Sequence, residues 1–310
     1  MIEIRQPGTR LTLQDAGRAG HRHQGIPSSG AADKLSFALA NYMVGNDWHL
    51  PALECVLGGQ HLRFHQDTVV AIAGAEMWAQ VNGQNVRNFS SFKVKSGDIL
   101  TFSFARIGCR SYIAVPGGFE GTEFLDSVST YLPAELGGFN GRSLQSNDRL
   151  KLKDVSTQTR SLPEAYQPRI SNHLVLRALE GPEFYDLTLS SQRHLFIDPY
   201  RATKNTNRMG ARLKGNLVVP DTTTHMTSSP LLPGTLQCPP DGQPILAMTD
   251  GHCTGGYLRA LQVIKADLWQ LGQVRPGTKI SFRRSIGDDA YEVLKGRNAY
   301  YGTLIDEFTF

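Results

Sequence analysis

Residues 233–257 read PGTLQCPPDGQPILAMTDGHCTGGY, and glycine and proline recur throughout them. The segment 239–242, PPDG, predicts a tight turn, because proline presets φ and glycine accepts a positive φ at no steric cost. The apolar run 244–248 that follows has the length of a buried strand. It ends at a polar, glycine-rich rim, residues 250–257, where main-chain amides can approach a ligand closely.

The rim carries side chains suited to proton transfer. Asp250, His252 and Thr254 form a candidate catalytic set, since histidine exchanges protons near neutral pH and an aspartate can orient it. Cys253 is disfavoured as a nucleophile, because adjacent residues of an extended loop tend to point apart. The alternative is an ordered cluster of β-turns that binds no ligand.

Neutral amides and arginines elsewhere extend this candidate site. Gln237 could contact the edge of an amide or lactam, or it could satisfy buried backbone groups. Arg208 and Arg212 are four residues apart, and paired guanidinium groups suit a carboxylate or a phosphate. If the fold does not bring these two together, they belong to a solvated basic loop. Asp15 and Arg18 raise the same question near the N-terminus.

Length and composition describe an ordinary globular protein. The 310 residues are enough for two cores, and 40% of them are apolar while 19% are charged. The net charge of +4 comes from scattered residues, so a nucleic-acid partner is not expected. No apolar run is long enough to span a bilayer, and the first residues do not resemble a signal peptide. We therefore expect no membrane partner.

Cysteine and histidine spacing excludes further kinds of site. The four cysteines contain no CxxC pair, and without a secretory signal we expect reduced thiols in a cytoplasmic protein. His21 and His23, with His61 and His65, lack a carboxylate or thiolate pattern that would complete a metal site. No metal is expected.

The first half of the chain predicts antiparallel β structure with one helix. Short apolar runs between residues 52 and 115 are separated by turn signals, and Asn82-Gly83 between two such runs is a strong hairpin signal. A strand is expected at 10–14. A helix is expected over 34–44, preceded by a loop and cap at 29–33.

The second half repeats this character after a polar segment, residues 154–172, that resembles a domain linker. Strands are expected at 174–179 and 279–282, a helix or turn over 183–196, and helices over 258–271 and in the C-terminal tail. Residues 205–215 are a polar segment punctuated by glycine. The stretch VKSGDILTF, 94–102, matches VRPGTKISF, 274–282, which favours two β domains of related build.

Longer motifs carry a resemblance to a known family. TLQDAGRAGHRHQGIPSSGAAD, RSYIAVPGGF, NRMGARLKG, LLPGTLQCPPDGQPILAMTDGHCTGGY and VIKADLWQLGQVRPG occur in order over nearly the whole chain. They resemble the family of the 5-oxoprolinase C subunit, also described as biotin-dependent carboxyltransferase, allophanate hydrolase subunit 2 or KipA-like. The resemblance implies a mostly β fold of two cyclophilin-like barrel domains with a few short helices. We place them at residues 1–160 and 161–310.

The resemblance also implies an activity that needs partners. As the C subunit, the chain would act with the A and B subunits of 5-oxoprolinase, the latter KipI-like, to hydrolyse 5-oxo-L-proline to L-glutamate with ATP. The alternatives are a biotin-dependent carboxyltransferase of the urea carboxylase type and a non-catalytic antagonist of a kinase inhibitor. The chain shows no biotin-carrier motif and no ATP-binding loop, so we expect the complex to bind ATP, and biotin would enter only under the first alternative.

The rim departs from the family pattern D-x-Q-T-T-G-G-Y-P at three positions. This chain has His252, Cys253 and Leu258 where glutamine, threonine and proline are usual, which implies an altered substrate preference or a changed catalytic role. The expected substrate contacts come from two sets of segments. They are Gln237, Gly255, Gly256 and Tyr257, with the catalytic set, on one side, and Asp15, Arg18, Asn207, Arg208 and Arg212 on the other.

Overall fold

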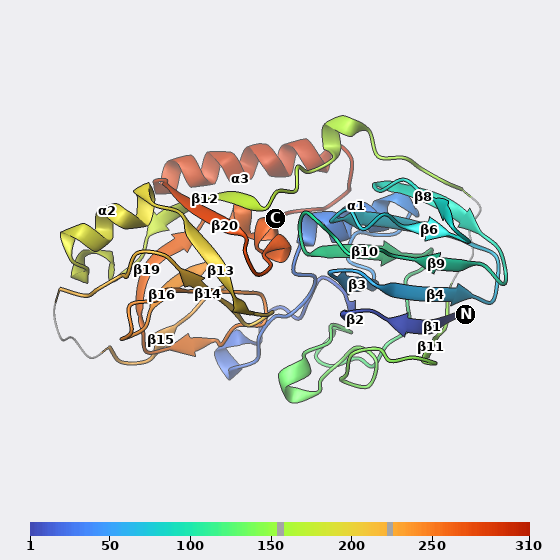
Figure 1. The fold of residues 1–310 in the computed structure, drawn as a ribbon, viewed down its shortest axis with the longest axis horizontal. Coiled ribbons are helices and arrows are strands. Elements are labelled where there is room, and N and C mark those ends of the chain that lie inside the picture. The colour runs from blue at the N-terminus through green and yellow to red at the C-terminus, as the bar shows by residue number, and fades with distance from the viewer. Residues whose placement is uncertain (154–157, 222–225) are drawn as a thin grey trace. The chain divides into compact units, whose positions relative to one another are not determined.

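The computed structural model describes residues 1–153, 158–221 and 226–310 (Figure 1). The chain forms two compact units. Unit 1 contains residues 1–18, 29–170 and 301–309, and unit 2 contains residues 19–28, 171–300 and 310. Four residues of the predicted linker, 154–157, lie outside the described residues, whereas residues 158–170 of it pack within unit 1, where Ser91 N donates to Arg160 O at 2.8 Å.

Unit 1 is built from two antiparallel sheets. One has the strand order β11-β1-β4-β9-β6-β7 and the other β2-β3-β10-β5-β8. The strands of the first sheet are β1 (Ile2–Pro7), β4 (Gln60–Phe64), β6 (Gln80–Val81), β7 (Gln84–Asn85), β9 (Ile99–Thr101) and β11 (Arg149–Leu150). Those of the second are β2 (Arg10–Gln14), β3 (Ala52–Val56), β5 (Thr68–Gly74), β8 (Ser90–Val94) and β10 (Arg110–Ala114).

Local signals in unit 1 produce the elements they predicted. Helix α1 (Lys34–Met43) packs against β5 and β10, and its N-cap Asp33 accepts a hydrogen bond from Ser36 N at 2.9 Å. Asn82 and Gly83 have φ of 51° and 84°, the left-handed pair that a two-residue hairpin turn between β6 and β7 requires. The short 3-10 helices of this unit are η2 (Leu132–Ala134) and η3 (Glu164–Tyr166).

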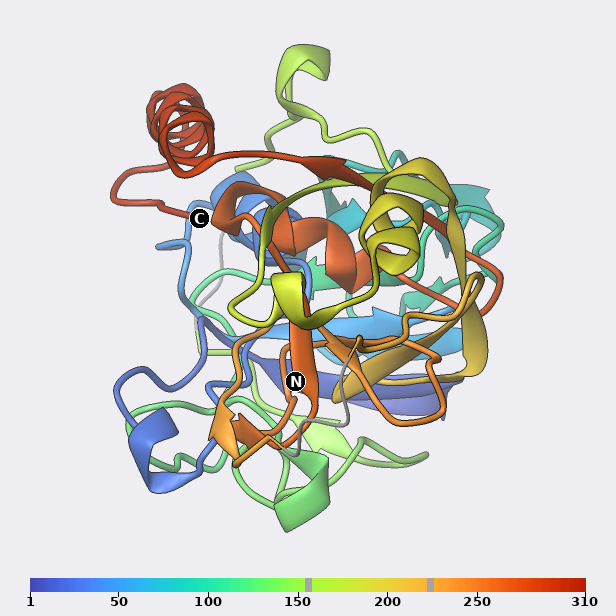
Figure 2. The same cartoon turned by 90° about the vertical axis from the view of Figure 1, so that its left-hand side faces the viewer.

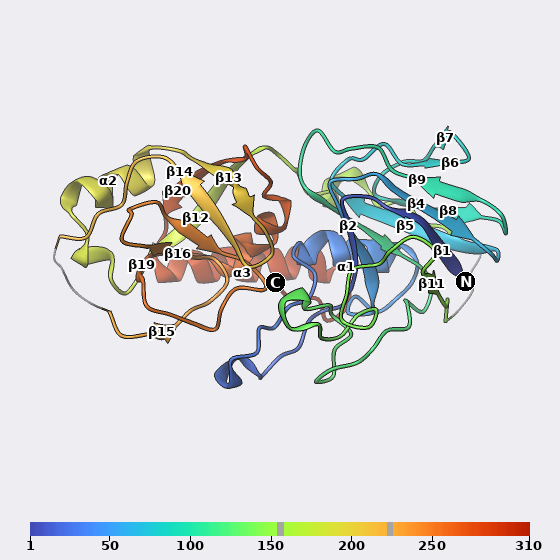
Figure 3. The ribbon, with the colours of Figure 1, turned by 60° about the horizontal axis from the view of Figure 1, so that its bottom comes forward.

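Unit 2 contains a closed seven-strand barrel of order β12-β19-β16-β17-β14-β13-β20. The barrel is on the side nearer the viewer in Figure 2. Only the β12–β20 pair is parallel among the described barrel strands. The strands are β12 (His173–Glu180), β13 (Tyr200–Thr206), β14 (Gly210–Lys214), β16 (Thr235–Cys238), β17 (Ile245–Ala247), β19 (Leu258–Val263) and β20 (Lys279–Arg284). The neighbours β13 and β14 are seen along their length in Figure 3.

The remaining described elements belong neither to the sheets of unit 1 nor to the barrel. They are η1 (Arg22–Gln24), η4 (Phe184–Asp186), α2 (Leu189–Ile197), the two-stranded ladder of β15 (Ser229–Pro230) with β18 (Thr254–Gly255), η5 (Lys265–Gln273) and α3 (Gly287–Gly302). No helix in the described part of the chain is both long and apolar enough to cross a membrane.

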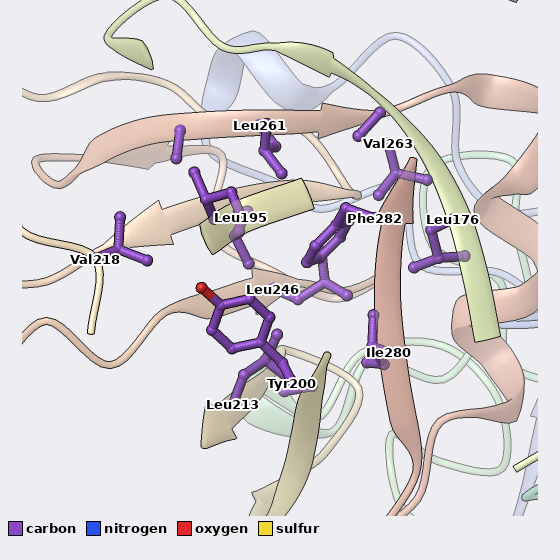
Figure 4. Packing of buried hydrophobic residues seen from close by; sticks show 14 of the residues in the cluster. Leu176, Leu195, Tyr200, Leu213, Val218, Leu246, Leu261, Val263, Ile280 and Phe282 are labelled. Atoms are coloured by element: carbon purple, nitrogen blue, oxygen red, sulfur yellow. The ribbon is translucent and has the colours of Figure 1, made fainter. Parts of the chain in front are cut away.

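The barrel has a buried apolar core, and one predicted helix is instead a strand of this barrel. Leu246, Leu261 and Phe282 converge with Tyr200 inside the barrel (Figure 4), and such fully buried side chains contribute about 1.5–3 kcal/mol each. The predicted helix over 258–271 is instead strand β19 followed by η5. Because β19 pairs with both β12 and β16, tertiary pairing overrides the helical spacing of its apolar residues. The polar segment 205–215 likewise includes all of β14.

The repeated nine-residue motif forms the same turn in both units. In each, the residue before the proline or serine donates its N–H to the side chain three residues later and accepts a hydrogen bond from that residue's N–H. The distances are 2.7 and 3.0 Å in turn 95–98, and 3.0 and 3.0 Å in turn 275–278. The glycines, Gly97 and Gly277, have φ of 98° and 90°. Shared sequence, backbone and hydrogen bonds support a related build.

Candidate functional site

A pocket of about 350 Å³ opens within unit 2 beside β14, β16 and β17. Its lining combines apolar side chains with amide, guanidinium, imidazole and phenol groups. The lining residues are Asn205, Asn207, Met209, Gly210, Arg212, Leu231, Gln237, Ile245, Ala247, His252 and Tyr257. Five of them, Asn207, Arg212, Gln237, His252 and Tyr257, belong to the site expected from the sequence.

An ion pair joins the turn before β14 to the turn after β17. The guanidinium of Arg208 donates to both carboxylate oxygens of Asp250, at 2.7 Å from Nε and 2.9 Å from Nη2. Asp250 N also donates to Arg208 O at 2.8 Å. Both side chains are buried. We call this contact the inner pair, and it holds the two turns together, because a bidentate guanidinium–carboxylate contact fixes distance and orientation.

A second arginine lies at the pocket itself. Arg212, on β14, pairs with Asp241 of the turn between β16 and β17. Both side chains are partly exposed to solvent. We call this contact the outer pair. Since it is reached by solvent, Arg212 can exchange Asp241 for the carboxylate of a ligand at a smaller desolvation cost than Arg208 could.

Two neutral amides lie at the pocket in different environments. Asn207 is exposed, and its Oδ1 accepts hydrogen bonds from the N–H groups of Met209 at 2.7 Å and Gly210 at 3.2 Å, which closes the turn before β14. Gln237 is buried on β16, next to an irregularity in the pairing with β19. Such a bulge redirects the side chains beside it, and here one of them lines the pocket.

The rim 250–257 depends on its glycines for close packing. A Cβ at Gly255 would lie 2.6 Å from Nε2 of Gln237, and one at Gly251 would lie 2.9 Å from Met209 O. Neither glycine has a positive φ, unlike Gly242 in the turn before β17, whose φ is 73°. The expected turn at 239–242 is therefore present, while the rim glycines serve close approach.

The catalytic set predicted on this rim is spread over different surroundings. His252 and Thr254 are exposed, and Asp250 is buried in the inner pair. Within the described residues, no hydrogen bond joins Asp250 to His252. Cys253, which lies between His252 and Thr254 in the sequence, is buried. Burial raises the pKa of the Cys238 thiol, on β16, to about 12, so this thiol stays protonated near neutral pH.

Asp15 and Arg18 have their partners within unit 1. The Asp15 carboxylate accepts hydrogen bonds from Gly17 N at 2.8 Å, Ser127 Oγ at 2.7 Å and Val128 N at 2.7 Å. Arg18 is buried and donates to the carbonyl oxygens of Phe124 and Ser129. Both side chains thus hold the loop 124–129, and their contact with a substrate stays a prediction.

One residue beside this pocket escapes prediction from the sequence. Arg22 donates from Nη2 to the carbonyl oxygens of Leu231, at 2.5 Å, and His252, at 3.4 Å, and both acceptor residues line the pocket. Arg22 lies between His21 and His23, and this HRH pattern suggests metal ligands rather than a role for the arginine. Among the described residues, no group of three or more His, Cys, Asp or Glu is arranged to hold a metal ion. The sequence signal for Arg22 is therefore weak, namely a basic residue between two histidines.

Comparison with known proteins identifies the family. The model for the carboxyltransferase domain, subdomain A and B, matches residues 24–284. The chain belongs to this family. Its relatives include the C subunit of 5-oxoprolinase from Escherichia coli (strain K12), 35% identical over 304 residues that cover 98% of this chain and 97% of that protein. The corresponding protein of Haemophilus influenzae (strain ATCC 51907 / DSM 11121 / KW20 / Rd), which has the same name, is 36% identical over 301 residues, covering 97% and 96%.

A solved structure shares the fold. The urea amidolyase of K. lactis aligns with a TM-score of 0.90 and 30% identity over 98% of this chain. The chain spans only 20% of that protein. The resemblance to the family of the 5-oxoprolinase C subunit, read from the motifs, is thus confirmed, and the mostly β fold with few helices is confirmed with it. The closed barrel of the described residues is in unit 2.

Proposed function

We propose that this chain is the C subunit of an ATP-dependent 5-oxoprolinase, which hydrolyses 5-oxo-L-proline to L-glutamate together with the A and B subunits. One observation carries the proposal. Two proteins named as this subunit of 5-oxoprolinase match the chain at 35% and 36% identity, over nearly the full length of both partners in the alignment. Conversely, the urea amidolyases and the urea carboxylase match only as parts of much longer proteins.

The chemistry of the pocket supports this substrate. Hydrolysis adds water to the lactam carbonyl and breaks the ring C–N bond, so the site must bind a small amide and a carboxylate. Arg212 would bind the carboxylate, since a guanidinium forms strong charge-assisted hydrogen bonds with it. Gln237 and Asn207 would contact the lactam, and His252 and Thr254 would transfer protons. The inner pair of Arg208 and Asp250 would hold the rim in place beside them.

The complex is part of the proposal. ATP would be bound and consumed by the assembly of the A, B and C subunits, of which the B subunit is KipI-like, and this chain would contribute the pocket. Two cyclophilin-like barrel domains, residues 1–160 and 161–310, and a cytoplasmic location complete the proposal. The turn shared by the two units supports the two related domains, and the four free cysteines support the cytoplasmic location.

A biotin-dependent carboxyltransferase is the second candidate. The TM-score of 0.90 with the K. lactis urea amidolyase favours it, because the chain shares the fold of part of a protein named for urea. In this function carboxybiotin would enter the pocket and urea would take the position of the lactam.

One experiment separates these functions. The purified chain is mixed with its A and B partner subunits, and glutamate release from 5-oxo-L-proline is followed with ATP. We expect glutamate only when all three proteins and ATP are present. A stable complex that releases no glutamate would refute the proposal. Carboxyl transfer to urea from a carboxylated biotin carrier would then establish the second candidate, and binding to the B subunit without turnover of either substrate would indicate a KipA-like regulator.

A further inference from the structure

The segment 19–28 groups with unit 2, although the residues on both sides of it belong to unit 1. We call it the strap. It contains η1, and its glycines Gly20 and Gly25 have φ of 86° and 82°, with no neighbouring atom within 4 Å of the position that a Cβ would take. These glycines are therefore required by backbone conformation, which lets the chain turn into the strap and out of η1.

Arg22 is the contact between the strap and the pocket. Its Nη2 donates to Leu231 O and His252 O, which belong to two segments twenty-one residues apart in the sequence. Those segments are already joined by one hydrogen bond, from Leu231 N to Cys253 O at 2.9 Å, and by the β15–β18 ladder next to it. The Arg22 guanidinium thus links the two chain segments at the end of the β15–β18 ladder, next to the pocket-lining residues Leu231 and His252.

The short ladder has few contacts of its own, although Arg259 Nη1 also donates to Pro230 O at 2.9 Å. β15 and β18 have two residues each and pair only through Ser229–Gly255 and Pro230–Thr254 within the described residues. An isolated two-stranded ribbon is marginal in water, so a cross-link at its end has a large effect on how well its residues are held. Thr254 and Gly255 in this ladder belong to the predicted site, and Gly255 packs against Gln237.

The strap also has two polar atoms that the fold does not satisfy. Arg22 Nη1 and His21 Nδ1 are buried and have no hydrogen-bond partner among the described residues. A buried polar atom without a partner costs about 1–3 kcal/mol, which a contact serving only to brace the fold would avoid. Such groups in a folded protein call for an explanation, and a role beside the pocket would supply one.

We propose that Arg22 is a positioning residue of the pocket, acting through the main chain of Leu231 and His252 so that their side chains line it in one arrangement. This inference rests on the proposed function for its catalytic consequence, but the contact it describes can be tested without any substrate. It deepens that function by assigning a role to a residue outside the pocket lining.

The test compares Arg22→Ala and Arg22→Lys with a control, Arg193→Ala, at a position on α2 outside the pocket lining. Hydrogen exchange is measured on peptides covering 229–236 and 250–257, with residues 210–214 of β14 as the internal reference. We expect exchange about tenfold faster in both test peptides of Arg22→Ala, an intermediate rate in Arg22→Lys, and no change in β14 or in Arg193→Ala. Equal exchange in Arg22→Ala and the unmodified chain would overturn the inference.

Kinetics in the assembled enzyme give the second measurement. Because Leu231 and His252 line the binding pocket and His252 would also transfer protons, Arg22→Ala should lower kcat/KM for 5-oxo-L-proline by about tenfold, and Arg22→Lys should restore part of this loss. An unchanged kcat/KM in Arg22→Ala would contradict a role in positioning the pocket. If the unmodified complex releases no glutamate, the proposed function fails, and the exchange measurement still decides the role of Arg22.

Discussion

The inner pair and the outer pair begin from arginines four residues apart, and they teach different lessons about the pocket. Each joins an arginine to an aspartate of a turn beside β17. The side chains of Arg208 and Asp250 are only 5% and 3% exposed, whereas those of Arg212 and Asp241 are 32% and 52% exposed. Both contacts are arginine–aspartate ion pairs, but their burial differs. The inner pair therefore suits a structural role, whereas the outer pair leaves an arginine that a ligand can reach.

A third pair lies between these extremes. Arg259 on β19 donates from Nε and Nη2 to Glu183, before η4, with side chains 18% and 17% exposed. The three pairs form a graded series within one unit. The effect of breaking a pair on stability should follow burial, because an unpaired charge costs more free energy where water cannot reach it.

Breaking the inner pair should have the largest effect. Arg208→Ala leaves the Asp250 carboxylate buried without its guanidinium, so we expect a loss of about 3–5 kcal/mol in the free energy of unfolding. Urea denaturation of the purified chain measures it. The double variant Arg208→Met with Asp250→Leu removes both charges and should lose less than Arg208→Ala alone. A single variant as stable as the unmodified chain would show that the inner pair does not hold the turns.

The intermediate pair should show its contribution through pH. The hydrogen bond from Arg259 holds the pKa of Glu183 below its usual range. A carboxyl whose pKa is lower in the folded state stabilises the fold above its unfolded pKa and loses this contribution as pH falls through the folded value. We expect Glu183→Gln to lose about 1–2 kcal/mol at pH 7.

The same comparison should vanish in acid. Thermal unfolding of Glu183→Gln and the unmodified chain between pH 7 and pH 3 should show a difference that shrinks below about pH 4.5, the ordinary range of glutamate. A difference that is constant over this range would mean that the charge of Glu183 contributes nothing and only the shape of the side chain matters.

The graded series also shows what could be read from the sequence. Local signals were sufficient for α1 with its cap at Asp33 and for the hairpin at Asn82-Gly83, because neighbouring residues alone decide these conformations. The prediction of a helix at strand β19 was wrong, because the partners β12 and β16 come from distant segments. Long-range pairing is the information that a local pattern lacks.

The candidate site follows the same division. Gln237, His252 and Tyr257 lie at one pocket, and all three come from the single stretch 233–257 that could be recognised in the sequence. The burial of Arg208 could not be foreseen, since its partner Asp250 is 42 residues away. Arg22 lies 209 and 230 residues before its acceptors, and only the fold reveals the contact.

Breaking the outer pair should have the smallest effect on stability and a clear effect on function. Arg212→Ala removes a solvent-reached ion pair, so the free energy of unfolding should change by less than about 0.5 kcal/mol. If Arg212 binds the substrate carboxylate, the lost charge-assisted hydrogen bonds should raise KM for 5-oxo-L-proline by about tenfold or more. Asp241→Asn is the matched control, because it breaks the same pair but keeps the guanidinium. It should leave KM unchanged or lower it, since the ligand no longer competes with an aspartate. Equal KM values in Arg212→Ala and the unmodified complex would remove Arg212 from the binding site and leave the outer pair as a surface contact.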